Sequence, residues 1–204
     1  MAELLPPGHV FAGLRAAGYR TIYIDPPWKF SSGPSRNPRR HYPTMSVEDI
    51  KALPVSDLAH PDGCRLLMWI TVPLLHRMRE VLDAYGFRYS SARVWAKLWP
   101  SEDEMFIYPN SLARGTGYEV IGNCELLVIG KRRRPKRLGN IKPASLFFAR
   151  RREHSRKPDV VRDEIARLYE GPRVEIFART QHPGFDVWGN ETSKFAPQMV
   201  GADQ

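Results

Sequence analysis

The tetrapeptide Asp25-Pro26-Pro27-Trp28 places a carboxylate, a stiff turn and a large aromatic ring directly after the apolar run TIYI. Prolines cannot continue a strand, so the run should end at Asp25. The Asp25 carboxylate and the Pro26 carbonyl can each accept an N–H bond from an amino group on a flat ring, while the Trp28 indole stacks on that ring. Two such acceptors would restore lone-pair character to an adenine-like amine. The structural alternative is a proline-rich turn with a packed tryptophan.

A second group of candidate residues lies in the segment 30–45, which is rich in glycine, serine, asparagine and proline and therefore predicts a mobile connection. Its side chains Arg36, Arg39 and Arg40 suit the phosphates of a nucleic-acid backbone, and Tyr42 is placed to close over a flipped base. The alternative is an exposed loop with solvated charges.

Charge is the third feature. The formal net charge is +9 and the sequence pI is about 9.8, which favours a polyanionic partner such as nucleic acid. Six of the seven residues in the run 131–137 (KRRRPKR) are basic. Such a run is either a solvated face or a track for a nucleic-acid backbone, and the sequence leaves both interpretations open.

Composition favours one globular domain spanning residues 1–204, because 42% of the 204 residues are hydrophobic. Cys64 and Cys124 are the two cysteines, with no CxxC pair, so we expect neither a disulfide framework nor a metal site. The sequence shows neither a signal peptide nor an apolar run of membrane-spanning length. These features predict a cytoplasmic protein without a membrane partner.

Apolar runs alternate with helix-like stretches along the chain, which predicts an α/β fold with a mostly parallel sheet and helices on both faces. In such sheets, ligands bind beyond the carboxyl ends of the strands, where Asp25 and Arg179 would both lie. We expect strands at 20–25, 63–71, 87–98, 124–130, 145–150 and 173–179, and helices at 10–17, 46–54, 72–87 and 158–171.

The motif Asp-Pro-Pro-Trp matches the catalytic signature of adenine-N(6) methyltransferases. With the segments that follow it in order, the chain resembles the MT-A-seventy family, which includes the messenger-RNA adenosine methyltransferase. The resemblance covers about residues 20–191, and we expect a bacterial or phage member. The segments that carry it are HYPTMSVEDI (41–50), LLMWIT (66–71), VWAKL (94–98), ARGTGY (113–118), CELLVIGK (124–131), EHSRKPDVVRDEIARL (153–168), RVEIFAR (173–179) and WGNE (188–191).

This resemblance implies a Rossmann-like fold that uses S-adenosyl-L-methionine, with permuted motif order: the amine-binding motif comes first and the cofactor strand last. The family's cofactor pocket implies a role for Lys157, which can reach a carboxylate at a helix start. Where many methyltransferases have a glycine-rich turn, this chain has Ala178-Arg179-Thr180. The cofactor-binding residues implied are Asp25, Lys157, Glu175, Phe177, Arg179, Gln181, His182, Asn190 and Glu191.

The implied activity is transfer of a methyl group to adenine N(6) in nucleic acid. Asp25 and the Pro26-Pro27 turn would orient the amine, Trp28 would support the ring, and Glu125 and Lys97 are expected on the substrate side by resemblance. DNA is the favoured substrate and RNA the alternative. A catalytically inactive partner subunit and a basic nucleic-acid-binding module without chemistry remain as other classes, and a homodimer is left open.

Overall fold

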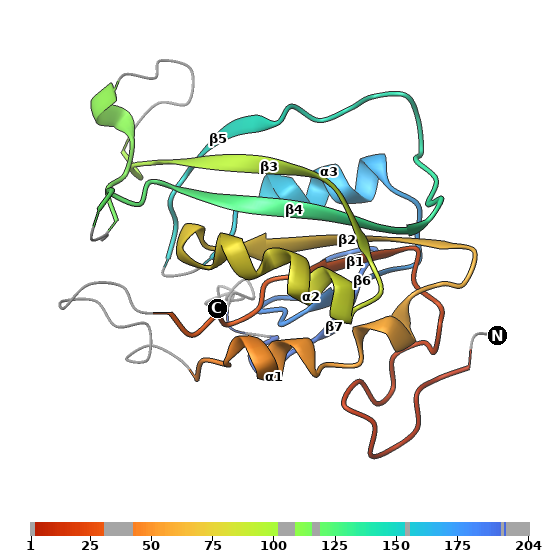
Figure 1. Cartoon of the computed structure of the whole chain (residues 1–204). Coiled ribbons are helices and arrows are strands. Elements are labelled where there is room, and N and C mark those ends of the chain that lie inside the picture. The colour runs from red at the N-terminus through yellow and green to blue at the C-terminus, as the bar shows by residue number, and fades with distance from the viewer. Residues whose placement is uncertain are drawn as a thin grey trace, which may run out of the picture.

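The computed structural model describes residues 3–30, 43–101, 109–115, 119–153, 156–192 and 194. Within them, seven strands form one sheet in the order β5-β3-β4-β2-β1-β6-β7 (Figure 1). The strands are β1 (Thr21–Ile24), β2 (Gly63–Ile70), β3 (Arg88–Leu98), β4 (Cys124–Arg133), β5 (Leu146–Arg150), β6 (Arg173–Ile176) and β7 (Asp186–Trp188).

The sheet is mixed but mostly parallel, as predicted. β1 runs parallel to β2 and β6, and β7 runs parallel to β6. β4 is antiparallel to both of its neighbours, β2 and β3, and β5 is parallel to β3. Only β4 therefore runs against the other strands of the described sheet, and its first residues lie at the edge where those strands end.

Helices cover both faces of the sheet, because successive residues of each buried strand point to opposite sides. On one face, α1 (Val47–Lys51) and α2 (Met78–Ala84) pack on Ile22, Ile24 and Met68. On the other, α3 (Asp159–Leu168) packs on Tyr23 and Leu67. Figure 1 shows α3 on the opposite side of the sheet from α1 and α2. No helix within the described ranges is long and apolar enough to cross a membrane.

Local sequence signals set several element ends. Ser46 caps α1 and accepts a bond from the Asp49 N–H, while the Asp49 side chain accepts one from the Ser46 N–H, as the sequence predicted. The segment expected to form one helix over 72–87 begins instead as the 3-10 helix η3 (Val72–Arg77) and continues as α2. A proline in the first turn of η3 accompanies this tighter start.

One prediction of secondary structure was wrong, and one strand was missed. Residues 10–17 form turns rather than a helix, and Gly13 has a φ of +82°, a left-handed conformation that interrupts a helix. The short edge strand β7 was not predicted, because only three residues pair there, with β6. Two further 3-10 turns, η2 (Val55–Leu58) and η4 (Pro109–Ser111), complete the described elements.

Candidate functional site

The turn after β1 is fixed by backbone hydrogen bonds. The Trp28 N–H donates to the Pro26 carbonyl at 2.8 Å, and the Met45 N–H donates to the Pro27 carbonyl at 2.8 Å. The Asp25 N–H donates to the Ile176 carbonyl of β6 at 3.5 Å. Asp25 is therefore held at the carboxyl edge of the sheet by a rigid turn, as predicted. The Pro26 carbonyl keeps a second lone pair, since each carbonyl oxygen can accept two bonds.

Trp28 occupies a different place from the one expected. Its side chain is 3% exposed and belongs to the core under α1. Its indole N–H donates to the Trp69 carbonyl at the end of β2, at 2.9 Å. Stacking of this indole on a substrate ring does not fit this placement, because the ring is already covered on the core side and its polar atom is satisfied. Trp28 instead anchors the turn that carries Asp25.

Asp25 belongs to a line of four alternating charges, which we call the ion chain: Asp25, Lys157, Glu125 and Lys97. Lys157 Nζ donates to Asp25 Oδ2 at 2.8 Å and lies 3.3 Å from Glu125 Oε2. Lys97 Nζ donates to Glu125 Oε1 at 2.5 Å. The sequence placed these residues on three separate strands and before a helix; the fold brings them together at one edge of the sheet.

The central charges of the ion chain are largely buried. The Lys157 side chain is 8% exposed and that of Glu125 is 15% exposed. Burial alone would raise the pKa of Glu125, but the ammonium groups of Lys157 and Lys97 outweigh it and lower the pKa to about 2. Glu125 is therefore a permanent anion at neutral pH, and it holds both lysines in place.

Two tryptophans line the ion chain. Lys157 Nζ lies 5.6 Å from the centre of the Trp69 ring, and Lys97 Nζ lies 5.1 Å from that of Trp95. The two rings meet edge to face, with centres 5.9 Å apart. Sequence reasoning gave neither ring a role, although both lie in strand segments that carried the family resemblance. Their π faces add to the stability of the two ammonium groups.

Glu175 is not available to a ligand in this structure. It is 2% exposed and lies on the α3 face of β6. Its two carboxylate oxygens accept bonds from Arg162 Nε and Nη2 of α3, each at 2.7 Å. The cofactor-binding role implied for Glu175 does not fit these contacts. The sequence could not reveal Arg162 as its partner, because an arginine in an amphipathic helix usually faces solvent.

The carboxyl ends of β6 and β7 bring four of the predicted cofactor residues together. Phe177 has a φ of +63°, which is strained for a residue with a side chain, and its ring lies 5.4 Å from that of Trp188. Arg179 Nε lies 3.9 Å from Glu191 Oε2, and the neighbouring Asn190 is exposed.

The close approach of these two segments requires glycine at position 189. A Cβ there would lie 2.7 Å from the Ala178 carbonyl oxygen. The Ala178 N–H in turn donates to the Trp188 carbonyl at 2.9 Å. The strained turn after β6 is thus clamped against the end of β7, and this clamp sets the position of the polar side chains beside it.

The remaining predicted site residues lie elsewhere. Gln181 is exposed, and His182 Nε2 is 3.1 Å from Asp163 Oδ1 of α3. The basic run 131–137 begins at the far end of β4, where Arg133 pairs with Gly63 at the start of β2. It therefore lies at the edge of the sheet opposite the ion chain. Arg36, Arg39, Arg40 and Tyr42 lie outside the described residues.

Comparison with known proteins adds to this geometry. The MT-A70 family model matches residues 19–191 of the chain. The type II methyltransferase M.MunI of Mycoplasma sp is 28% identical over 210 residues, which covers 91% of this chain and 83% of that protein. The N(6)-adenine-specific methyltransferase METTL4 of Mus musculus is 30% identical over 191 residues, covering 87% of this chain and 38% of that protein.

A third relative is the N(6)-adenosine-methyltransferase catalytic subunit METTL3 of Homo sapiens, which is 24% identical over 203 residues. That match covers 93% of this chain and 32% of METTL3. The chain thus spans most of M.MunI but less than two fifths of either METTL protein.

Proposed function

The chain belongs to the MT-A70 family, and on this basis we propose that it transfers a methyl group from S-adenosylmethionine to the N(6) amine of adenine in nucleic acid. The observation that carries the proposal is the position of Asp25. Its carboxylate stands at the carboxyl edge of the sheet on a rigid turn, and Lys157 holds it through a 2.8 Å bond. The Pro26 carbonyl lies in the same turn, so two acceptors are available to one amine.

The polar groups around this edge fit the proposed cofactor. Lys157 and Arg179 offer positive charge to its carboxylate, and Glu191 and Asn190 offer acceptors to its ammonium and hydroxyl groups. When bound, S-adenosylmethionine supplies a methyl group on a positively charged sulfur as the electrophile. These residues need not cradle a phosphate, because this cofactor carries none.

The residues of the chain would act mainly by orientation. Asp25 and the Pro26 carbonyl accept the two amine hydrogens and direct the nitrogen lone pair toward the electrophile. Lys157 holds the Asp25 carboxylate in position, while Glu125 holds Lys157 from the other side. After methyl transfer the surplus proton of the amine leaves through Asp25 or to water, so no separate general base is required.

DNA is the substrate we favour. One relative named for adenine, METTL4 of Mus musculus, is 30% identical, whereas one named for adenosine, METTL3 of Homo sapiens, is 24% identical. RNA is the second candidate, because another relative, the N6-methyladenosine RNA methyltransferase MTA1 of Cryphonectria parasitica, is 28% identical over 193 residues. An inactive partner subunit is disfavoured by the intact Asp25 and its ordered charge partners.

We place this activity in one domain that spans residues 1–204. A cytoplasmic location is part of the proposal, because Cys64 and Cys124 are free thiols, as in a reducing compartment. The proposal does not depend on a homodimer, which stays open.

The test is methyl transfer from a labelled donor to a panel of single- and double-stranded DNA and RNA, with S-adenosylmethionine affinity measured by calorimetry. We expect cofactor binding, and label recovered as N(6)-methyladenine in at least one adenine-containing DNA. Label in RNA alone would support the second candidate. Cofactor binding without label in any nucleic acid would contradict the proposal.

A further inference from the structure

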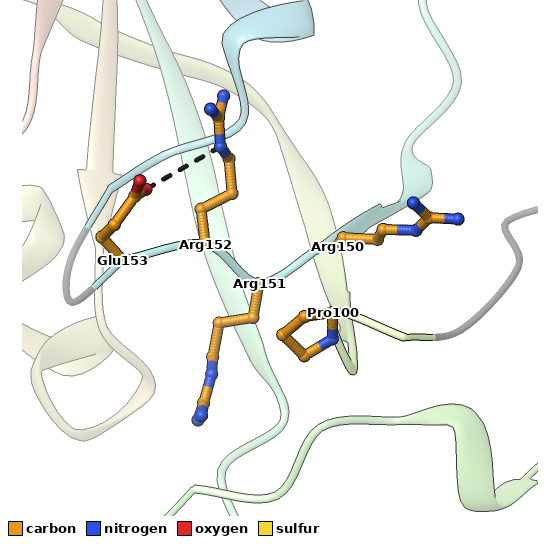
Figure 2. A pocket seen from close by; sticks show the side chains of 5 residues that line it. All are labelled: Pro100, Arg150, Arg151, Arg152 and Glu153. Atoms are coloured by element: carbon orange, nitrogen blue, oxygen red, sulfur yellow. Dashed lines mark ion pairs between the residues drawn. The ribbon is translucent and has the colours of Figure 1, made fainter. Parts of the chain in front are cut away.

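An open hollow of about 400 Å³ lies where β3 and β5 end, lined by Pro100, Arg150, Arg151, Arg152 and Glu153. We call it the arginine hollow. Leu98 pairs with Arg150 at the ends of these two parallel strands, and the Arg151 N–H donates to the Leu98 carbonyl at 2.8 Å. The paired ends of two sheet strands therefore hold the residues that line the hollow. Figure 2 shows the three arginine side chains leaving the chain in different directions around Pro100.

The three guanidinium groups differ in their surroundings. Arg152 is paired with Asp159 at the start of α3, and its Nε lies 3.9 Å from Glu153 Oε2 (Figure 2). Arg151 lies over the Trp99 ring, 5.3 Å from its centre, and within the described part of the chain it forms no ion pair. Arg150 is exposed. The lining of three arginines and one glutamate thus carries an excess of positive charge toward solvent.

This lining suits a phosphate better than a neutral ligand. Guanidinium groups bind phosphate oxygens through paired, charge-assisted hydrogen bonds. Contact with the Trp99 ring limits the motion of the Arg151 guanidinium, so less freedom is lost when it binds. A cationic groove with an aromatic side chain beside it is also the usual arrangement in proteins that bind single strands.

The hollow adjoins the ion chain along both segments that form it. Lys97, which donates to Glu125, lies three residues before Pro100. On the other segment, Arg152 pairs with Asp159, two residues after Lys157. The hollow and the Asp25 carboxylate therefore share one edge of the sheet, whereas the basic run 131–137 lies at the opposite edge.

We propose that the arginine hollow binds a backbone phosphate of the nucleic-acid strand whose adenine lies at Asp25, with Arg150 and Arg151 as the ligands. This rests on the proposed function for the identity of the strand. It assigns a phosphate contact to residues 150–151, which lie outside the segments 30–45 and 131–137 that the sequence singled out.

The test compares three proteins: wild type, Arg150→Gln/Arg151→Gln, and the control Arg134→Gln/Arg137→Gln. Both variants lose two positive charges, but the control residues lie in the run at the opposite edge of the sheet. Arg152 is left intact because it pairs with Asp159. Binding of a fluorescent, adenine-containing single-stranded DNA is measured by anisotropy over a series of salt concentrations, and S-adenosylmethionine binding by calorimetry.

We expect the Arg150→Gln/Arg151→Gln variant to bind the oligonucleotide roughly ten-fold or more weakly at low salt. The slope of log affinity against log salt should flatten by about 0.7, the value for one phosphate contact on a single strand. Cofactor affinity should stay at the wild-type value, and the control should keep the wild-type slope.

Three results would overturn the inference. The first is an unchanged salt slope in the Arg150→Gln/Arg151→Gln variant. The second is an equal change of slope in the control, which would indicate an effect of overall charge alone. The third is a loss of cofactor affinity, which would make the hollow part of the cofactor site. Methyl transfer by the wild type is followed on the same oligonucleotide. Failure of that transfer here and on every nucleic acid of the DNA and RNA panel, while the two variants still differ, would contradict the proposed function and leave the hollow as a phosphate site.

Discussion

Replacement of Glu125 by glutamine removes the anion at the centre of the ion chain and keeps the size of the side chain. The two ammonium groups beside it lower the pKa of Glu125 from near 4.5 to about 2. A shift of that size corresponds to about 3 kcal/mol of folding free energy at neutral pH. Because the folded-state pKa lies below the unfolded one, this stabilisation is complete above about pH 5 and is lost as the pH falls toward 2.

The measurement is urea unfolding of wild type and Glu125→Gln at pH 7 and at pH 3. The difference in unfolding free energy between the two proteins should be about 3 kcal/mol at pH 7 and about 1 kcal/mol at pH 3. Titrating groups away from the ion chain are common to both proteins and cancel in this difference. A difference that stays constant between the two pH values would refute the assignment of the low pKa to Glu125.

Three further substitutions test the surrounding contacts. Lys157→Ala should weaken S-adenosylmethionine binding in calorimetry while the circular dichroism spectrum stays native; unchanged affinity would contradict a cofactor-binding role for this lysine. Trp28→Phe removes the N–H that donates to Trp69 and should cost about 1–2 kcal/mol in urea unfolding; a stability equal to wild type would show that this bond does not anchor the turn. Glu175→Ala removes two of the bonds of the buried Arg162, which keeps its bond to Asp159 Oδ1 at 3.0 Å, and should cost about 3 kcal/mol, with a loss below 1 kcal/mol as the contrary result.

The sequence predicted those features that depend on neighbouring residues. The two prolines after a buried run placed Asp25 at the end of β1, and the alternation of strands and helices predicted the mostly parallel sheet. The capped start of α1 at Ser46 followed from the side chains of one helical turn. In each case the physical cause lies within a few residues of the element it determines.

The pairing of distant charges could not be predicted in this way. Lys97, Glu125 and Lys157 meet because β4 runs antiparallel beside β3 and β2, a topology that no local spacing encodes. Glu175 could serve a ligand or Arg162 equally well until the packing of α3 on β6 was known. Sequence patterns therefore located the candidate site, but its internal contacts required the fold.

The burial of individual side chains was the second feature that the sequence did not predict correctly. A tryptophan after two prolines is as suited to stacking on a ligand as to packing in a core. The acceptor that decided the matter for Trp28 is the Trp69 carbonyl, 41 residues away in the chain. The segment 10–17 was wrongly predicted to be a helix: its apolar residues do contact the core, but Gly13, with a positive φ, interrupts a helix there.

The central claim is that Asp25 orients an adenine amine for methyl transfer. It is tested most directly by the single-turnover rate of methyl transfer to adenine-containing DNA in Asp25→Ala, at saturating S-adenosylmethionine. Loss of one charged acceptor in the transition state should lower the rate by about 2–4 kcal/mol, which is on the order of 10²–10³-fold. Cofactor affinity should change far less. A rate within a few-fold of wild type would contradict the account.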